Sequence, residues 1–333
     1  MSLTQTDAAP AAPSARRRLS FRSIAERWSL VIAFIAAAAV FSVAQPGTFL
    51  TWANARAILD DASVLSVLAV GITLVLVLGE FDLSVGLVVG LSAAAGVSMM
   101  AYHHLSTGVA VIAAVGAGGI AGLANGIAVA YVRIPSFIAT LAVGSIAAAI
   151  ELAITQTSIF VGLSPSYSQI ATTRLIGFPL RAVIAAGVTL AFLVLLRTTV
   201  YGRHASSIGD NPAAARLTGV AIERAKVIGF VLAGLSAGVA SVLATSSANS
   251  YYPSIGTGYL LPAYAAAFLG LSLGGGVRFN VLGSYLGVLL LGMVTTGLTM
   301  LNQPSWTAAL VQGVVLLVAV AGVAVRRRGA LGR

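Results

Sequence analysis

Long apolar runs separated by short polar breaks dominate the pattern of this chain. Each run is close to the roughly 20 residues that an α-helix needs to cross the hydrocarbon of a bilayer. A transmembrane β-barrel would instead alternate apolar and polar positions. The pattern therefore predicts an all-α polytopic membrane protein with about ten transmembrane helices. We place the spans at 28–45, 62–79, 84–102, 107–131, 135–157, 182–198, 226–247, 259–276, 280–301 and 307–325.

One polar break, at 79–86, separates two aliphatic runs and contains the acids Glu80 and Asp82. A charge at the centre of a bilayer costs about 3 kcal/mol on insertion scales, and the chain has only nine acids. Two interpretations remain open. The break is either a short loop with wetted acids, or a tightly turned, discontinuous segment that lines a translocation path or fixes two helices together.

Asp82 has two candidate roles in this break. Its carboxylate can cap the next helix by accepting from the backbone N–H of Ser84 or Val85, or it can contact a substrate. Capping is favoured, because counting the spans puts this turn on the cytoplasmic side.

Small residues and prolines predict further features of the spans. Gly118, Gly122 and Gly126 recur every four residues, which is typical of closely packed membrane helices. Asn125 on the same stretch is expected to hydrogen-bond across helices. Pro135 suits the first turn of the following span. A proline at 262 and the glycines of 270–276 predict a broken or irregular helix.

Composition supports an integral membrane protein and argues against an enzyme. The chain is 58% hydrophobic and 8% charged, whereas soluble domains are about 25% charged. It has no cysteine and three histidines, so we expect no metal site, no cofactor and no catalytic residue. There is no phosphate-binding loop, and Lys226 is the only lysine. The chain is not expected to hydrolyse ATP.

The net charge of +10 is distributed like a membrane topology signal rather than a nucleic-acid surface. Basic clusters precede the first span and follow the last. Ten spans would put both termini in the cytoplasm, with most other basic residues on the same side and only three outside: Arg56, Arg174 and Arg181. We therefore expect a disordered basic tail at 1–27, a transmembrane domain at 28–325 and a basic tail at 326–333.

The longest cytoplasmic loop, about 199–225, carries a dense mixed charge. Asn211 followed by Pro212 predicts the start of a short helix, and Gly219 predicts its end. A second short helix is expected at 222–226. The loop is either a solvated connector or, as two short charged helices favour, a docking site for a soluble partner.

Two other segments outside the spans carry simpler expectations. Residues 51–61 are polar enough to lie along the membrane surface, with Asn54 at a helix start. The outer loop at 162–181 could cover a vestibule, with Tyr167 as an interfacial aromatic.

Three ordered motifs resemble the ribose-type ABC transporter permeases. Residues 79–86 (GEFDLSVG) resemble the acidic turn whose usual form is Gly-Gly-Ile-Asp-Leu-Ser-Val-Gly. Asn125-Gly126 with 134–141 (IPSFIATL) and the loop from Tyr201 to Gly219 resemble two further motifs of that family. Order and spacing agree over roughly 50–325. Glu80, Phe81 and Ser136 depart from the usual residues of these motifs.

The resemblance implies a multi-pass permease of the bacterial cytoplasmic (inner) membrane that imports a monosaccharide or small polyol. Its implied partners are cytoplasmic ATP-binding cassette ATPases, a periplasmic or lipid-anchored sugar-binding protein, membrane lipid and a second permease copy in a homo- or heterodimer, but no nucleic acid. The implied ATPase-coupling residues are Arg203, Asp210, Asn211, Ala214, Ala215, Arg216, Gly219 and Glu223. The structural turn or translocation path would comprise Gly79, Glu80, Asp82, Ser84, Gly86, Asn125, Pro135, Phe137, Thr140 and Ser272.

The alternative is a secondary, proton-coupled small-molecule transporter that uses Glu80, Asp82 or Glu151 as proton carrier. Such a carrier would not need the helical charged loop at 201–226. An intramembrane enzyme is the third class, and the missing catalytic set disfavours it.

Overall fold

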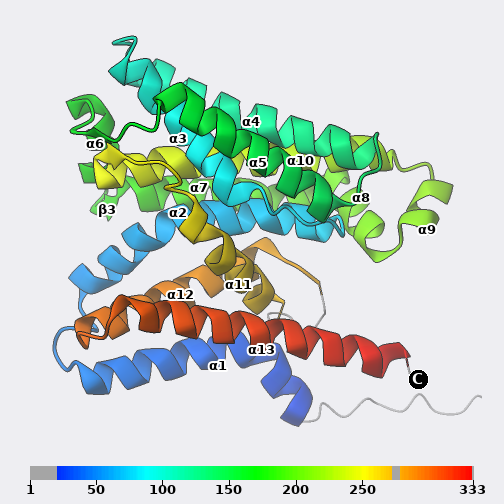
Figure 1. Ribbon diagram of the computed structural model, residues 1–333. Helices are drawn as coiled ribbons and strands as arrows, with labels where there is room; N and C mark the ends of the chain where they lie inside the picture. The colour runs from blue at the N-terminus through cyan, green and yellow to red at the C-terminus, as the bar shows by residue number, and fades with distance from the viewer. Residues whose placement is uncertain (1–20, 272–277, 332–333) are drawn as a thin grey trace, which may run out of the picture.

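The computed structural model describes residues 21–271 and 278–331 (Figure 1). Ser272, residues 1–20 of the predicted N-terminal tail and residues 332–333 of the predicted C-terminal tail lie outside the described residues. Residues 21–27, expected to be disordered, are instead helical. Helices occur at all ten predicted runs: α1 (Phe21–Ala44), α2 (Trp52–Val77), α3 (Val85–Ala101), α4 (Thr107–Ala130), α5 (Ser136–Thr155), α7 (Leu180–Thr198), α10 (Ile222–Ala248), α11 (Leu260–Gly270), α12 (Val281–Met300) and α13 (Ser305–Leu331). The fold is mostly helical, as predicted.

Six helices of the described chain are long and apolar enough to cross a membrane: α2, α4, α5, α7, α10 and α12. Helix α3 and the apolar parts of α1 and α13 are shorter. The number of crossings, ten, and the side of the termini stay predictions.

The remaining elements are short and lie between the long helices. They are α6 (Pro165–Thr172), α8 (Val200–Asp210), α9 (Pro212–Leu217), the 3₁₀ helix η1 (Thr257–Tyr259), and the two-residue strands β1 (Phe160–Val161), β2 (Arg174–Leu175), β3 (Phe178–Pro179) and β4 (Ser250–Tyr251). Strand β1 pairs antiparallel with β4, and β2 pairs with β3. Figure 1 shows α8 and α9 at one end of the bundle and α6 and β3 at the other.

Helices α2 and α10 form the buried centre, and α4 packs closely against α10. A methyl group added at Gly118 would lie 2.2 Å from the carbonyl oxygen of Gly234, and one at Gly122 would lie 2.3 Å from that of Phe230. Gly126 approaches Val227 in the same way. The predicted close packing through small residues is confirmed, and Gly234 provides it from the α10 side.

Two expectations about helix boundaries are wrong. Helix α2 begins at Trp52, with Thr51 as N-cap accepting from Asn54 N–H. Residues 51–61 are therefore the start of α2 rather than a separate surface segment. Asn54 is buried, and its side chain donates to the carbonyl of Phe49 at 2.7 Å. Residues 222–226 are likewise the first turn of α10 and not a separate helix.

Two further features differ from the sequence-based expectations. Helix α8 was not predicted at all. Tyr167 on α6 is buried rather than interfacial, and its hydroxyl lies 2.7 Å from Thr245 Oγ1.

Helix α11 lies where a broken or irregular helix was predicted, and the glycines at 274–276 of that prediction lie outside the described residues. This helix has 11 residues and follows η1 directly. Pro262 lies in its first turn, where the missing N–H has no intrahelical partner to lose. Residues 252–256 before it are not helical.

Candidate functional site: the acidic turn and the charged loop

Helix α2 ends in a tight, internally bonded turn that requires a glycine. Gly79 has φ +81°, a left-handed conformation that glycine adopts without strain. The N–H of Gly79 donates to Leu76 O at 3.1 Å, and that of Glu80 donates to Val75 O at 3.1 Å. These two bonds form a Schellman motif, which satisfies carbonyls at the helix end. The chain therefore leaves α2 in a fixed direction.

Side chains from two other helices hold the next three backbone N–H groups. The N–H of Phe81 donates to Ser136 Oγ at 3.1 Å, and that of Leu83 donates to Thr140 Oγ1 at 3.0 Å; both acceptors are on α5. The N–H of Asp82 donates to Tyr264 Oη of α11 at 2.9 Å. The Tyr264 hydroxyl also donates to Asp82 O at 3.0 Å. Buried N–H groups must be paired, so α5 and α11 supply what a regular helix would have supplied.

The carboxylate of Asp82 stabilises the start of α3. It accepts from Ser84 N–H at 2.9 Å and from the Ser84 hydroxyl at 2.5 Å, and Asn125 Nδ2 donates to Ser84 Oγ at 2.8 Å. All three residues are buried. The predicted hydrogen bond from the Ser84 N–H to the Asp82 carboxylate and the predicted cross-helix bond of Asn125 are confirmed. The wetted-loop interpretation is wrong for Asp82, because its carboxylate faces protein donors.

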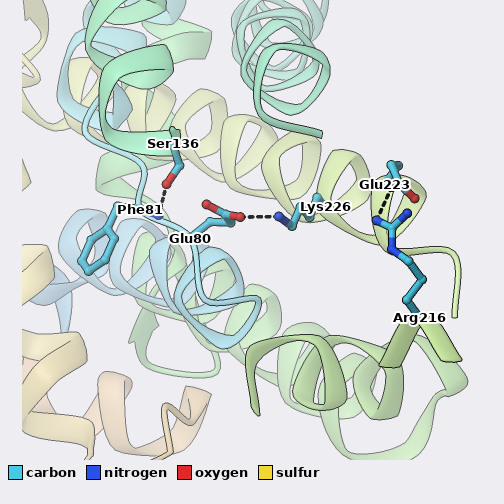
Figure 2. A network of polar contacts seen from close by, with 6 residues as sticks. All are labelled: Glu80, Phe81, Ser136, Arg216, Glu223 and Lys226. Carbon is cyan, nitrogen blue, oxygen red and sulfur yellow. Dashed lines mark hydrogen bonds and ion pairs between the residues drawn. The ribbon is translucent and has the colours of Figure 1, made fainter. Parts of the chain in front are cut away.

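Glu80 binds α10 through an ion pair. Its Oε1 lies 2.5 Å from Lys226 Nζ, and both side chains are about four-fifths buried (Figure 2). Glu80 also lines two cavities of about 510 Å³ and 310 Å³. Five charged residues line the smaller cavity: Glu80, Arg133, Arg216, Glu223 and Lys226.

The charged loop is a pair of short helices, α8 and α9. Asn211 caps α9 by accepting from Ala214 N–H at 3.1 Å, as predicted, and Gly219 after its end has φ +81°. Two ion pairs connect the loop to neighbouring segments. These are Arg216 with Glu223 (2.6 Å) and Arg278 with Asp210 (2.5 Å).

An apolar cluster fastens this loop to the end of α2. Its members come from α2, α8, α9 and α10: Leu78, Ala205, Ile208, Ala215, Ile222 and Ala225. The backbone of Gly209 approaches so closely that an added methyl would lie 2.0 Å from Val77 O. The Tyr201 hydroxyl donates to Ala225 O at 3.2 Å. Burial raises the pKa of Tyr201, so it remains a donor at neutral pH.

A third buried acid, Glu151 on α5, lies away from this turn. Its Oε1 accepts from the Tyr251 hydroxyl at 3.0 Å and from Ser254 N–H at 2.8 Å. It therefore ties α5 to the non-helical segment that precedes α11. Each of the three acids that a proton-coupled carrier would use, Glu80, Asp82 and Glu151, is engaged by protein groups.

The predicted turn residues are mostly brought together. Glu80, Asp82, Ser84, Asn125 and Thr140 take part in the contacts above, and Gly79 forms the turn. Gly86 faces the backbone of residue 256, and Pro135 is the N-cap residue of α5. Phe137 is instead 54% exposed, and Arg203 is exposed on α8.

Sequence reasoning missed two contributors to the site. Tyr264 and Lys226 were not among the candidate residues, although Lys226 is the chain's only lysine. Their partners lie 182 and 146 residues away along the chain, so no local pattern connects them to the turn.

Long apolar helices around a buried, hydrogen-bonded turn define a helical integral membrane protein. No cluster of metal-binding side chains occurs in the described part of the chain. The chain belongs to the family described as "Branched-chain amino acid transport system / permease component", which matches residues 54–320.

Curated relatives extend over nearly the whole chain. The ribose import permease protein RbsC of Escherichia coli K12 is 34% identical over 92% of this chain and 96% of its own length. The L-arabinose ABC transporter permease protein AraH of Azospirillum brasilense is 33% identical, with 92% and 90% covered. The solved PsaBC from Streptococcus pneumoniae in complex with Fab aligns with a TM-score of 0.46 at 16% identity, covering 87% of this chain and 95% of that chain, which is too low to support a conclusion. The resemblance to ribose-type ABC transporter permeases is confirmed.

Proposed function

We propose that this chain is the membrane subunit of an ATP-driven importer and translocates a monosaccharide or small polyol. An external binding protein would deliver the substrate, and separate cytoplasmic ATPases would supply the energy. The subunit would cross the bacterial inner membrane about ten times, with both termini in the cytoplasm, and work as a homo- or heterodimer. Relatives named for ribose, L-arabinose and xylose support a monosaccharide substrate.

Helix α9 is the observation that carries the docking role. It is capped at its start, closed by Gly219, and held against the bundle by buried Ala215. Its last residue, Leu217, is nevertheless 90% exposed, at the end of the bundle where α8 and α9 lie (Figure 1). A rigid helix with one side packed and an apolar residue exposed suits insertion into a groove of a soluble partner.

Co-purification with the ATPases of the same cell tests this docking role. Leu217→Asp, Gly219→Pro and Arg216→Glu should each reduce the ATPase recovered with the tagged chain by about tenfold, while membrane insertion stays normal. Leu175→Asp is the matched control, because Leu175 is an exposed leucine at the opposite end of the bundle. Recovery of the ATPase at normal yield with all three variants would contradict the docking role.

Substrate class is tested separately with the assembled complex. Proteoliposomes containing the chain, its ATPases and a binding protein should take up one of D-ribose, L-arabinose, D-xylose or ribitol in an ATP-dependent way. ATP-dependent uptake of a different class of solute, with none of these four transported, would overturn the assignment to monosaccharides and small polyols.

A further inference from the structure

The acidic turn at 79–84 contacts the charged loop of α8 and α9 on one side and helices α5 and α11 on the other. The loop side has three kinds of contact. The apolar cluster around Leu78 includes residues of α8, α9 and α10. Gly209 of α8 lies against Val77 O. Charged side chains provide the third contact.

The charged contact runs through the first turn of α10 (Figure 2). Arg216 of α9 pairs with Glu223, and Lys226 pairs with Glu80. Glu223 and Lys226 are three residues apart, so they occupy the same face of α10. The outer pair is exposed, whereas the inner pair is largely buried and therefore less screened by water and salt. Lys226 is thus the charged link between α10 and the turn.

The core side of the turn consists of hydrogen bonds between the turn backbone and side chains of α5 and α11. Ser136 and Thr140 bind the turn to α5. Tyr264 of α11 is bonded twice to the same residue, accepting from Asp82 N–H and donating to Asp82 O. Its ring also stacks on Phe81, with centroids 6.3 Å apart and planes at 19°. The turn cannot shift without moving α11 or breaking these bonds.

We infer that the turn at 79–84 transmits displacement of the α8–α9 loop to helices α5 and α11. Lys226 is the positioning residue on the loop side, and Tyr264 is the positioning residue on the core side. This inference rests on the proposed function, since it assigns the route by which ATPase movement reaches the core helices. Contiguous contacts alone do not establish coupling, so the test must measure coupling itself.

The measurement is the number of substrate molecules taken up per ATP hydrolysed by the complete complex in proteoliposomes. Tyr264→Phe removes the hydroxyl and keeps the ring, so we expect this ratio to fall about tenfold. Tyr285→Phe is the matched control, because the Tyr285 hydroxyl forms no hydrogen bond to another described residue. An unchanged ratio in Tyr264→Phe would overturn the inference.

A charge exchange tests the loop side independently. Lys226→Glu and Glu80→Lys should each lower the ratio, and the double variant should restore it to within about threefold of wild type. Absence of rescue by a double variant that still binds the ATPases would count against the pair as a link.

A third measurement covers the case in which a variant does not assemble. In the wild-type complex, ATP should change the hydrogen-exchange rate of the amides of residues 81–84; an unchanged rate would overturn the inference. Wild-type complex without any ATP-driven uptake would instead refute the proposed function, and the inference with it. Normal wild-type uptake with unaltered variant ratios would refute the inference alone.

Discussion

Two buried carboxylates, Asp82 and Glu151, hold irregular backbone in place in different parts of the bundle. Asp82 accepts from Ser84, two residues away, and so stabilises its own turn. Glu151 lies about four helical turns beyond the start of α5, and accepts from Tyr251 and Ser254, which are 100 and 103 residues away. One acid makes a local structure, whereas the other joins two distant segments.

The comparison teaches that a buried acid in this chain need not be a proton site. Both carboxylates accept hydrogen bonds from protein donors, which fix their orientation. The two carboxylates differ in which part of the structure depends on them. Loss of Asp82 should disorganise a turn on which α3, α5 and α11 depend, whereas loss of Glu151 should release one segment from α5.

The largest effect is expected for Asp82→Ala. It leaves two buried donors of Ser84 unsatisfied, which costs about 3 kcal/mol, and it should nearly abolish ATP-driven uptake. Asp61→Ala is the control, because Asp61 is exposed on α2. Thermal unfolding in detergent and uptake in proteoliposomes check both. Equal losses in the two variants would remove the special status of the turn.

Glu151→Ala should have the next largest effect, a loss of about 2 kcal/mol in thermal stability. Glu151→Gln keeps an oxygen that can accept from Tyr251 and Ser254, and should cost less than about 1 kcal/mol. If the two substitutions were equally damaging, the negative charge rather than the acceptor would be essential.

Gly90→Ala perturbs Glu151 from the side of α3. The added methyl would lie 2.3 Å from Glu151 Oε2, so the carboxylate must move away from its donors. We expect a loss of about 1–2 kcal/mol. Gly116→Ala is the matched control, because a methyl group added at Gly116 would have no other atom within 4 Å. Similar melting temperatures for the two variants would show that the carboxylate position is not constrained.

Thr140→Val should have the smallest effect of the series. It removes the acceptor for Leu83 N–H and leaves the shape nearly unchanged, for a cost of about 1 kcal/mol. Thr198→Val is the matched control: the Thr198 hydroxyl donates to its own helix carbonyl, as that of Thr140 does, but it is exposed. Chemical or thermal unfolding curves that coincide would contradict the anchoring role of Thr140.

The helices and the contacts between residues close in sequence could be predicted from the sequence, whereas the contacts between distant segments could not. Apolar runs predicted the positions of ten helices, and the Asp82–Ser84 and Asn211–Ala214 bonds follow from neighbouring residues. Tyr264, Lys226 and the partners of Glu151 required the fold, because nothing in a Leu- and Ala-rich chain specifies which distant segments meet.

Helix α8 was not predicted, although the sequence contains a pattern that indicates it. Gly202, Ala205 and Ile208 are three residues apart and all buried, which is one face of a helix. The polar residues between them and the two glycines, Gly202 and Gly209, obscured that spacing. Glycine here marks close packing against Leu196 and Val77 rather than a loop.

The source of energy for uptake tests the central claim most directly. Vesicles containing this chain alone, with an imposed proton gradient, should take up no sugar. Vesicles containing the chain with its ATPases and binding protein should take up sugar when ATP is supplied, and should keep doing so when Glu151 is replaced by Gln. Gradient-driven uptake by the chain alone would contradict the account and favour a proton-coupled carrier.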